Sequence, residues 1–234
     1  MSAFEVIAIL LAGMAAGTIN TIVGSGSLVT FPTLLFFGYP PLVANISNNI
    51  GLVPGGISGV HGYRRELARA VPTIRHLGPA SLVGGIIGAL LLLVVFGPAL
   101  QKRARAHHPA TGAPDRKVLV WVLVALTGVY GGYFGAAQGV ILIGLLSTLM
   151  SEELQVLNGL KNLLALIVNG VAALTFVVFS SHHVDWRAAA LVGVGSLIGG
   201  VIGARIGRRL PPLVLRGVII VVGVVAILKM TVFA

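Results

Sequence analysis

The segments SLVGGIIGAL (residues 81–90) and SLIGGVIGAR (residues 196–205) decide the fold of this chain. They agree at seven of ten positions and lie 115 residues apart, so much of the second half of the 234-residue sequence repeats the first. Both copies lie in long apolar stretches. An internal repeat in a hydrophobic chain is a common construction in transporters that bind a solute where two pseudo-symmetric halves meet.

The composition identifies a protein that is solvated by lipid. The chain is 56% hydrophobic and only 9% charged, with a mean hydropathy of +1.01, values that a water-soluble surface does not reach. Residues 6–60, 76–101 and 118–151 contain no Asp, Glu, Lys or Arg, and a helix needs about 20 apolar residues to cross the hydrocarbon core. Because strand alternation is absent, we predict an all-α, polytopic transmembrane helical bundle.

The net charge of +10 does not indicate a nucleic-acid partner. The basic residues are confined to short gaps between apolar runs, at residues 64–75, 102–117 and 205–216. Charge in such loops sets topology and contacts anionic headgroups. We expect a multi-pass protein of the plasma or inner membrane with residues 64–75 and 102–117 on the cytoplasmic side. Counting each broken helix as one crossing puts residues 205–216 on the opposite side.

The repeat defines the domain organisation. Residues 3–100 form a first transmembrane repeat, residues 101–117 a basic linker, and residues 118–233 a second repeat. Each repeat begins with a long segment interrupted by glycines, at Gly24–Ser27 and at Gly135–Gly139, which predicts a broken helix. Further landmarks pair between the copies: Gly13 and Gly17 with Gly128 and Gly132, Gly26 with Gly139, and Asn45 and Asn49 with Asn158 and Asn162.

The two copies differ in length after the shared glycine-rich segment. The second continues into a further span at residues 213–233, whereas the first reaches Lys102 within thirteen residues of Ala89. We therefore expect about seven crossings instead of eight. The missing span would leave small-residue faces at Gly84 and Gly88 exposed, which favours a homodimer.

Polar amides inside the apolar runs are the candidates for solute binding, because an unpaired amide in hydrocarbon costs a few kcal/mol. One interpretation is that they converge beside the glycine-rich breaks, where helix N-termini receive an anion. The other is hydrogen bonding between helices for packing. Lys161 lies well inside a span and either supplies charge for an anion or snorkels to the interface. The predicted substrate-binding residues are Gly24, Ser25, Gly26, Ser27, Asn45, Asn49, Gln138, Gly139, Asn158, Lys161 and Asn162.

Signatures of an enzyme or a cofactor site are not readable. Gly24-Ser25-Gly26 lacks the third glycine and the preceding strand of a dinucleotide fingerprint. With no cysteine in the chain, thiolate metal sites are excluded, and His182-His183 with Asp185 is interpreted as a solvated loop. We expect no cofactor, no metal and no catalytic residue. An intramembrane enzyme and a transport-inactive remnant remain as alternatives.

The segment AGTINTIVGSGSLVTFPTLLFFGYPPLVANISNNIG (residues 16–51), followed by an Arg-Arg pair and SLVGGIIGALL, resembles the sulfite exporter TauE/SafE family of membrane permeases. The likeness covers nearly the whole chain, and its family-like residues are Gly24, Gly26, Pro32 and Leu34, with Asn45 and Asn48 beyond them. It implies two related four-span halves and transport of small anions such as sulfite or organosulfonates without turnover. The chain departs from the pattern at Ser25 and Ser27 and in its missing span.

Overall fold

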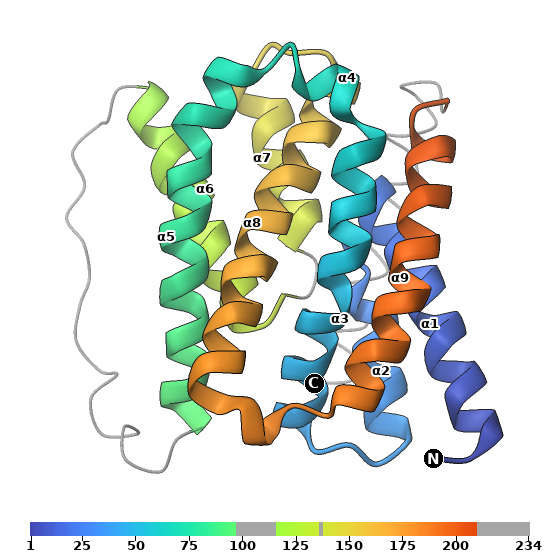
Figure 1. Cartoon of the computed structure of the whole chain (residues 1–234). Helices are drawn as coiled ribbons and strands as arrows, with labels where there is room; N and C mark the ends of the chain where they lie inside the picture. The colour runs from blue at the N-terminus through green and yellow to red at the C-terminus, as the bar shows by residue number, and fades with distance from the viewer. Residues whose placement is uncertain (97–115, 136–137, 210–234) are drawn as a thin grey trace.

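The computed structural model describes residues 1–96, 116–135 and 138–209, and within these ranges every regular element is helical. Four of the helices are long and apolar enough to cross a membrane, which confirms the predicted fold class. The expected last span, residues 213–233, lies outside the described residues. The elements are α1 (Ala3–Ile22), α2 (Ser27–Phe36), α3 (Pro41–Gly62), α4 (Arg64–Leu67), α5 (Val71–Phe96), α6 (Arg116–Tyr133), α7 (Gln138–Leu149), α8 (Leu154–Ser180), η1 (Ser181–His183) and α9 (Trp186–Gly207) (Figure 1).

Both repeats begin with a helical hairpin. Gly24 and Gly135 end α1 and α6 with positive φ angles of 98° and 71°, a conformation that glycine adopts without steric cost. The backbone N–H of each donates five residues back, to Ile19 and to Tyr130. The breaks that the sequence predicted are therefore confirmed at both places.

The chain reverses direction at each break, so α2 returns along α1. The rings of Phe4 and Phe37 lie 6.0 Å apart, and the Tyr39 hydroxyl donates to Glu5 Oε1 at 3.0 Å. Burial, with a further contribution from this hydrogen bond, raises the pKa of Tyr39 to about 12, so the hydroxyl stays a donor. Each hairpin thus returns to its starting face instead of crossing once.

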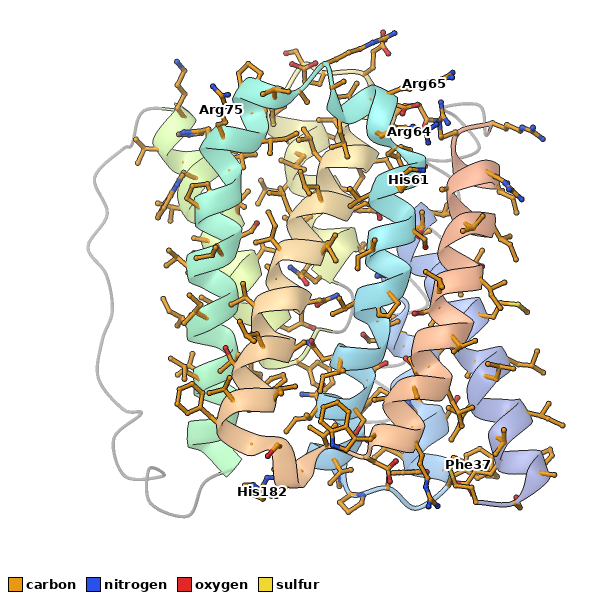
Figure 2. The ribbon with its side chains drawn as sticks, in the orientation of Figure 1. Phe37, His61, Arg64, Arg65, Arg75 and His182 are labelled. Carbon is orange, nitrogen blue, oxygen red and sulfur yellow. The ribbon has the colours of Figure 1, made fainter. Side chains whose placement is uncertain are left out.

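This reversal corrects the predicted location of the third basic segment. The Arg208 Nε donates to Glu66 Oε1 at 2.8 Å, which puts the end of α9 beside α4. The prediction that residues 205–216 lie on the side opposite to residues 64–75 is therefore wrong for residues 205–209, the described part of that segment. We call the shared surface the basic face (Figure 2); its described residues are Arg64, Arg65, Arg69, Arg75, Lys117, Arg205, Arg208 and Arg209.

The two repeats exchange their first helices. α1 packs along α9, and α6 packs along α5 (Figure 1). The first helix of each half therefore lies against the last long helix described in the other half. A Cβ added at Gly199 would overlap the carbonyl oxygen of Met14, and one added at Gly88 would overlap that of Val129. Gly84 and Gly88 are buried in this interface. The expectation that they are exposed was wrong, and a homodimer has no support from these faces.

The exchanged contacts also correct the register of the first helices. Gly17 faces the carbonyl oxygen of Ser196, and Gly128 faces that of Ser81. Gly17 is therefore the counterpart of Gly128, one helical turn away from the predicted pairing of Gly17 with Gly132. A hydrophobic helix gives little sequence signal to fix such a shift, because glycines recur at four-residue intervals along both helices.

The described helices on either side of the connection between the repeats, α5 and α6, end and begin at opposite faces of the molecule. His76 near the start of α5 lies beside Lys117 at the start of α6, with Nε2 3.4 Å from the Lys117 carbonyl oxygen. Both helices then run away from the basic face (Figure 1), and α5 alone has 26 residues, about 39 Å. Phe96 and Arg116 therefore lie at opposite faces, and the expected missing span falls between them, outside the described residues.

The charge distribution predicts the orientation in the membrane. Among the described residues beyond the helix interiors, the opposite face carries Arg187 with Glu5 and Asp185, so the positive-inside rule puts the basic face in the cytoplasm. Because the chain has no cysteine, single cysteines at exposed Ala68 and His182 give a clean test. A membrane-impermeant maleimide applied to intact cells should label His182→Cys and leave Ala68→Cys unlabelled until the membrane is opened. The reverse pattern would invert the topology.

Candidate functional site

The tips of the two hairpins meet inside the bundle. The backbone N–H of Gly139 donates to the Gly24 carbonyl oxygen at 2.8 Å. A Cβ on either glycine would overlap the backbone of the other, so only glycine permits this approach. The structure thus brings together the two breaks that the sequence paired, and it does so through backbone contact between the two halves.

A helix N-terminus lies on each side of this contact. α2 starts at Ser27 with Gly26 as its N-cap and has no side-chain cap, and α7 starts at Gln138. No described residue accepts from the backbone N–H of Ser25, Gly26 or Ser27. Unsatisfied N–H groups carry the positive end of a helix dipole and form a ready site for an anion.

Amides on α3 and α8 cap the C-terminal ends of α6 and α1, the first helix of the other repeat in each case. Asn45 Nδ2 on α3 donates to the carbonyl oxygen of Tyr133 at the end of α6, at 3.0 Å. Asn162 Nδ2 on α8 donates to the carbonyl oxygen of Thr21 at the end of α1, also at 3.0 Å. These bonds satisfy carbonyl groups that every helix C-terminus leaves unpaired. They come from Asn45 and Asn162, which the sequence did not pair with each other; Asn158, the predicted counterpart of Asn45, donates to the Tyr63 hydroxyl and, at 3.5 Å, to the Thr21 carbonyl oxygen.

Lys161 lies at the C-terminal end of α1. Its side chain is 0% exposed, and its Nζ donates to the carbonyl oxygens of Asn20 at 3.1 Å and Thr21 at 3.0 Å. The alternative that Lys161 snorkels to the interface is wrong, because the ammonium points inward. No described carboxylate pairs with it; the negative end of the α1 dipole faces it instead. Two of its three N–H groups have acceptors.

Several buried polar atoms around the hairpin tips have no described hydrogen-bond partner. Buried polar groups are nearly always satisfied by protein, water or ligand, so these atoms are candidates for contact with a solute or with water. The atoms are Ser25 Oγ, Asn49 Oδ1, Gln138 Nε2 and Asn158 Oδ1. All four residues belong to the set predicted from sequence.

The structure adds Thr30 and Tyr63, which sequence reasoning did not single out. Thr30 hydrogen-bonds to Asn48 Oδ1, and Asn48 Nδ2 donates to Ser27 Oγ at 3.2 Å, which fixes α2 against α3. Asn158 Nδ2 donates to the hydroxyl of buried Tyr63 at 2.7 Å. The spacing of Ser27 and Thr30 on one helix face was the available signal for the first pair. No sequence signal pointed to Tyr63, because it lies directly before the basic loop that begins at Arg64.

The geometry is that of two inverted halves with a polar centre, and the sequence comparison agrees. Residues 9–230 match the family described as "Sulfite exporter TauE/SafE". The chain belongs to the TauE/SafE family. The resemblance inferred from residues 16–51 is thereby confirmed, and the family membership makes this chain a membrane transporter protein.

Similar TauE/SafE proteins carry the same general description. A "Probable membrane transporter protein ORF9" of a Sinorhizobium species is 26% identical, with 97% of this chain and 93% of the relative covered. A "Probable membrane transporter protein" of Haemophilus influenzae is 25% identical over 93% and 91%, and "YfcA" of Escherichia coli is 26% identical over 93% and 86%. The alignment with the Sinorhizobium protein runs over 245 positions, more than the 234 residues here. No solved structure matches the chain.

Proposed function

We propose that this chain is a plasma or inner membrane permease for a small anion, of the sulfite or organosulfonate class, which binds where the two hairpin tips meet. The observation that carries the proposal is the group of unsatisfied N–H groups and orphaned polar atoms beside the Gly24–Gly139 contact. The proposed binding residues are Gly24, Ser25, Gly26, Ser27, Asn45, Asn49, Gln138, Gly139, Asn158, Lys161 and Asn162.

Electrostatics favour an anion over a cation at this place. The α2 N-terminus presents backbone N–H groups, and buried Lys161 adds a positive charge with no described carboxylate to neutralise it. A tetrahedral or pyramidal oxyanion accepts several hydrogen bonds at once, which suits donors that converge from backbone, amide and hydroxyl groups. Of the orphaned atoms, Ser25 Oγ and Gln138 Nε2 can donate to such an anion, whereas the oxygens Asn49 Oδ1 and Asn158 Oδ1 would accept from a water molecule or from a protonated oxyanion.

The exchanged helices suggest how such a site opens alternately to the two faces. α1 ends under the caps from α8, and α6 ends under the cap from α3, so each hairpin is held by the other half. Inverted repeats allow one half to adopt the conformation of the other, which exposes a central site to one face and then to the opposite face.

The transport proposal predicts saturable anion exchange that depends on Ser25. Purified protein in sealed proteoliposomes loaded with sulfite should accumulate labelled sulfite or a sulfonate by counterflow, while sulfate and small carboxylates compete with different strengths. Ser25→Ala removes an orphaned hydroxyl, so the fold keeps its melting temperature. The loss of one hydrogen bond to a charged ligand costs about 1.5–3 kcal/mol, so the apparent KM should rise at least tenfold.

The matched control is Ser147→Ala, which removes an exposed hydroxyl of α7 that is bonded to the Gly144 carbonyl oxygen. This variant should transport like the unmodified chain. Equal KM values for both serine variants would place the anion elsewhere. Absence of counterflow for every anion in sealed vesicles would favour the transport-inactive alternative, and conversion of a labelled solute in detergent would favour the enzyme alternative.

A further inference from the structure

A cationic pocket lies between α3 and α9 at the basic face, apart from the hairpin tips. Its volume is about 290 Å³, and Ser58, His61, Gly62, Arg64, Val201, Ala204, Arg205 and Arg208 line it. Gly59 and Gly203 of the same helices face Thr21 of α1, so the pocket opens on the outer side of the α3–α9 contact. His61, Arg64 and Arg65 lie at this end of the bundle in Figure 2.

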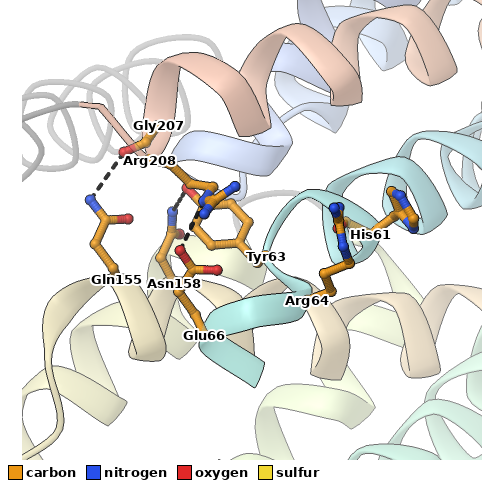
Figure 3. A network of polar contacts seen from close by, with 8 residues as sticks. All are labelled: His61, Tyr63, Arg64, Glu66, Gln155, Asn158, Gly207 and Arg208. Carbon is orange, nitrogen blue, oxygen red and sulfur yellow. Dashed lines mark hydrogen bonds and ion pairs between the residues drawn. The ribbon is translucent and has the colours of Figure 1, made fainter. Parts of the chain in front are cut away.

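The positive charge in the pocket is only partly balanced. Arg208 donates through Nε to Glu66 Oε1 at 2.8 Å, which leaves its two Nη groups for another acceptor. Arg64 donates through Nη1 to the carbonyl oxygen of His61 at 3.1 Å, so its charge is not neutralised (Figure 3). Arg205 is exposed and has no ion-pair partner among the described residues. Three guanidinium groups therefore share one carboxylate.

The surface below the pocket is apolar and exposed. On α9, Val201 and Leu197 lie one and two turns before Arg205 and are 38% and 45% exposed, and Ile57 on α3 is 55% exposed. Ser58 forms part of the floor, where its hydroxyl bonds to the carbonyl oxygens of Gly55 and Leu197 at 2.9 and 3.1 Å. Cations at the membrane interface stand directly above side chains at the depth of acyl chains.

We propose that this pocket binds the phosphate group of an anionic phospholipid from the leaflet at the basic face. Planar guanidinium groups bind phosphate oxygens in pairs, and basic pockets between transmembrane helices at the cytoplasmic side are suited to lipid headgroups. The aliphatic side chains of α3 and α9 supply the surface along which the acyl chains lie. The site joins two elements of different repeats, α3 from the first and α9 from the second, so the lipid braces their contact.

A lipid titration tests the site on the full-length protein. Delipidated protein in non-ionic detergent is titrated with phosphatidylglycerol, with phosphatidylcholine or with inorganic phosphate, and the melting temperature is recorded. Phosphatidylglycerol should raise the melting temperature in a saturable way, whereas the other two should leave it unchanged. An equal rise with phosphatidylcholine would overturn a site for the anionic headgroup, and an equal rise with inorganic phosphate would mean a free anion in place of a lipid.

Paired charge variants locate the binding. Arg64→Gln with Arg205→Gln should weaken the apparent affinity for phosphatidylglycerol at least tenfold, while Arg65→Gln with Arg69→Gln removes the same charge from the same face outside the pocket and should leave the affinity unchanged. An equal loss of affinity in both double variants would mean that the lipid responds to the overall surface charge, and this would defeat the proposal. If the first pair does not fold, Arg205→Gln alone carries the comparison with Arg65→Gln, because neither arginine has a hydrogen bond among the described residues.

Discussion

Gly199→Ala is expected to lower the stability of the protein by about 1–3 kcal/mol, the usual cost of forcing one extra methyl group into a packed interface. The new Cβ would overlap the Met14 carbonyl oxygen, and α1 and α9 would have to separate along their whole contact. Gly88→Ala meets the Val129 carbonyl oxygen in the equivalent interface and should cost a similar amount. The two sites are distant, so the double variant should show the sum of both losses.

Thermal unfolding in detergent, followed by size-exclusion chromatography of the surviving fraction, measures the effect. The control is Gly170→Ala on α8, where no described atom lies within 4 Å of the added Cβ. Alanine is the better helix former by about 1 kcal/mol, so this control should be neutral or more stable. The packing of α1 against α9 predicts that stability falls in Gly199→Ala and is unchanged or higher in Gly170→Ala. A Gly199→Ala protein as stable as the unmodified chain would mean that α1 and α9 do not touch as described.

Lys161→Gln is expected to abolish most anion transport while the protein still folds. Glutamine keeps N–H donors, on a side chain one bond shorter than that of lysine, but it removes the buried positive charge proposed to attract the solute. Asn48 occupies the equivalent position of the first repeat, which shows that an uncharged amide fits this helix face. The apparent affinity for the anion should fall at least tenfold, about 1.4 kcal/mol.

Equilibrium binding of a labelled anion and counterflow should both be measured for Lys161→Gln, with melting temperature as the folding readout. Lys161→Arg retains the charge and should retain part of the activity, and Lys117→Gln removes an exposed lysine at the basic face and should have no effect. A Lys161→Gln variant that melts at a lower temperature but binds the anion normally would assign Lys161 to the capping of α1 alone.

Most of the architecture could be predicted from the order of apolar and basic segments. The repeat separated the two halves, and the glycines at 24 and 135 marked the hairpin tips. Of the proposed site, the pairing of the two breaks was also readable. These features are local, because they depend on φ angles, proline and the distribution of charge along the chain.

Other features required the tertiary structure. A glycine break in sequence does not say whether the next helix continues or turns back, and that difference moved Arg205, Arg208 and Arg209 to the other face. The direction of the Lys161 side chain depended on where α1 ends, in another repeat. The partner of Gly84 and Gly88 likewise lay outside their own half.

The sequence by itself determined that this protein is a helical membrane protein of two related halves, because hydropathy and charge decide which segments leave water and a repeat must fold alike twice. The tertiary structure alone decided that the halves exchange their first helices and that amides and a lysine of one half cap a helix of the other. Packing between helices depends on close contact of particular backbone atoms. The contacts of Lys161 and Asn162 with the end of α1 join segments more than a hundred residues apart, and no local pattern encodes them.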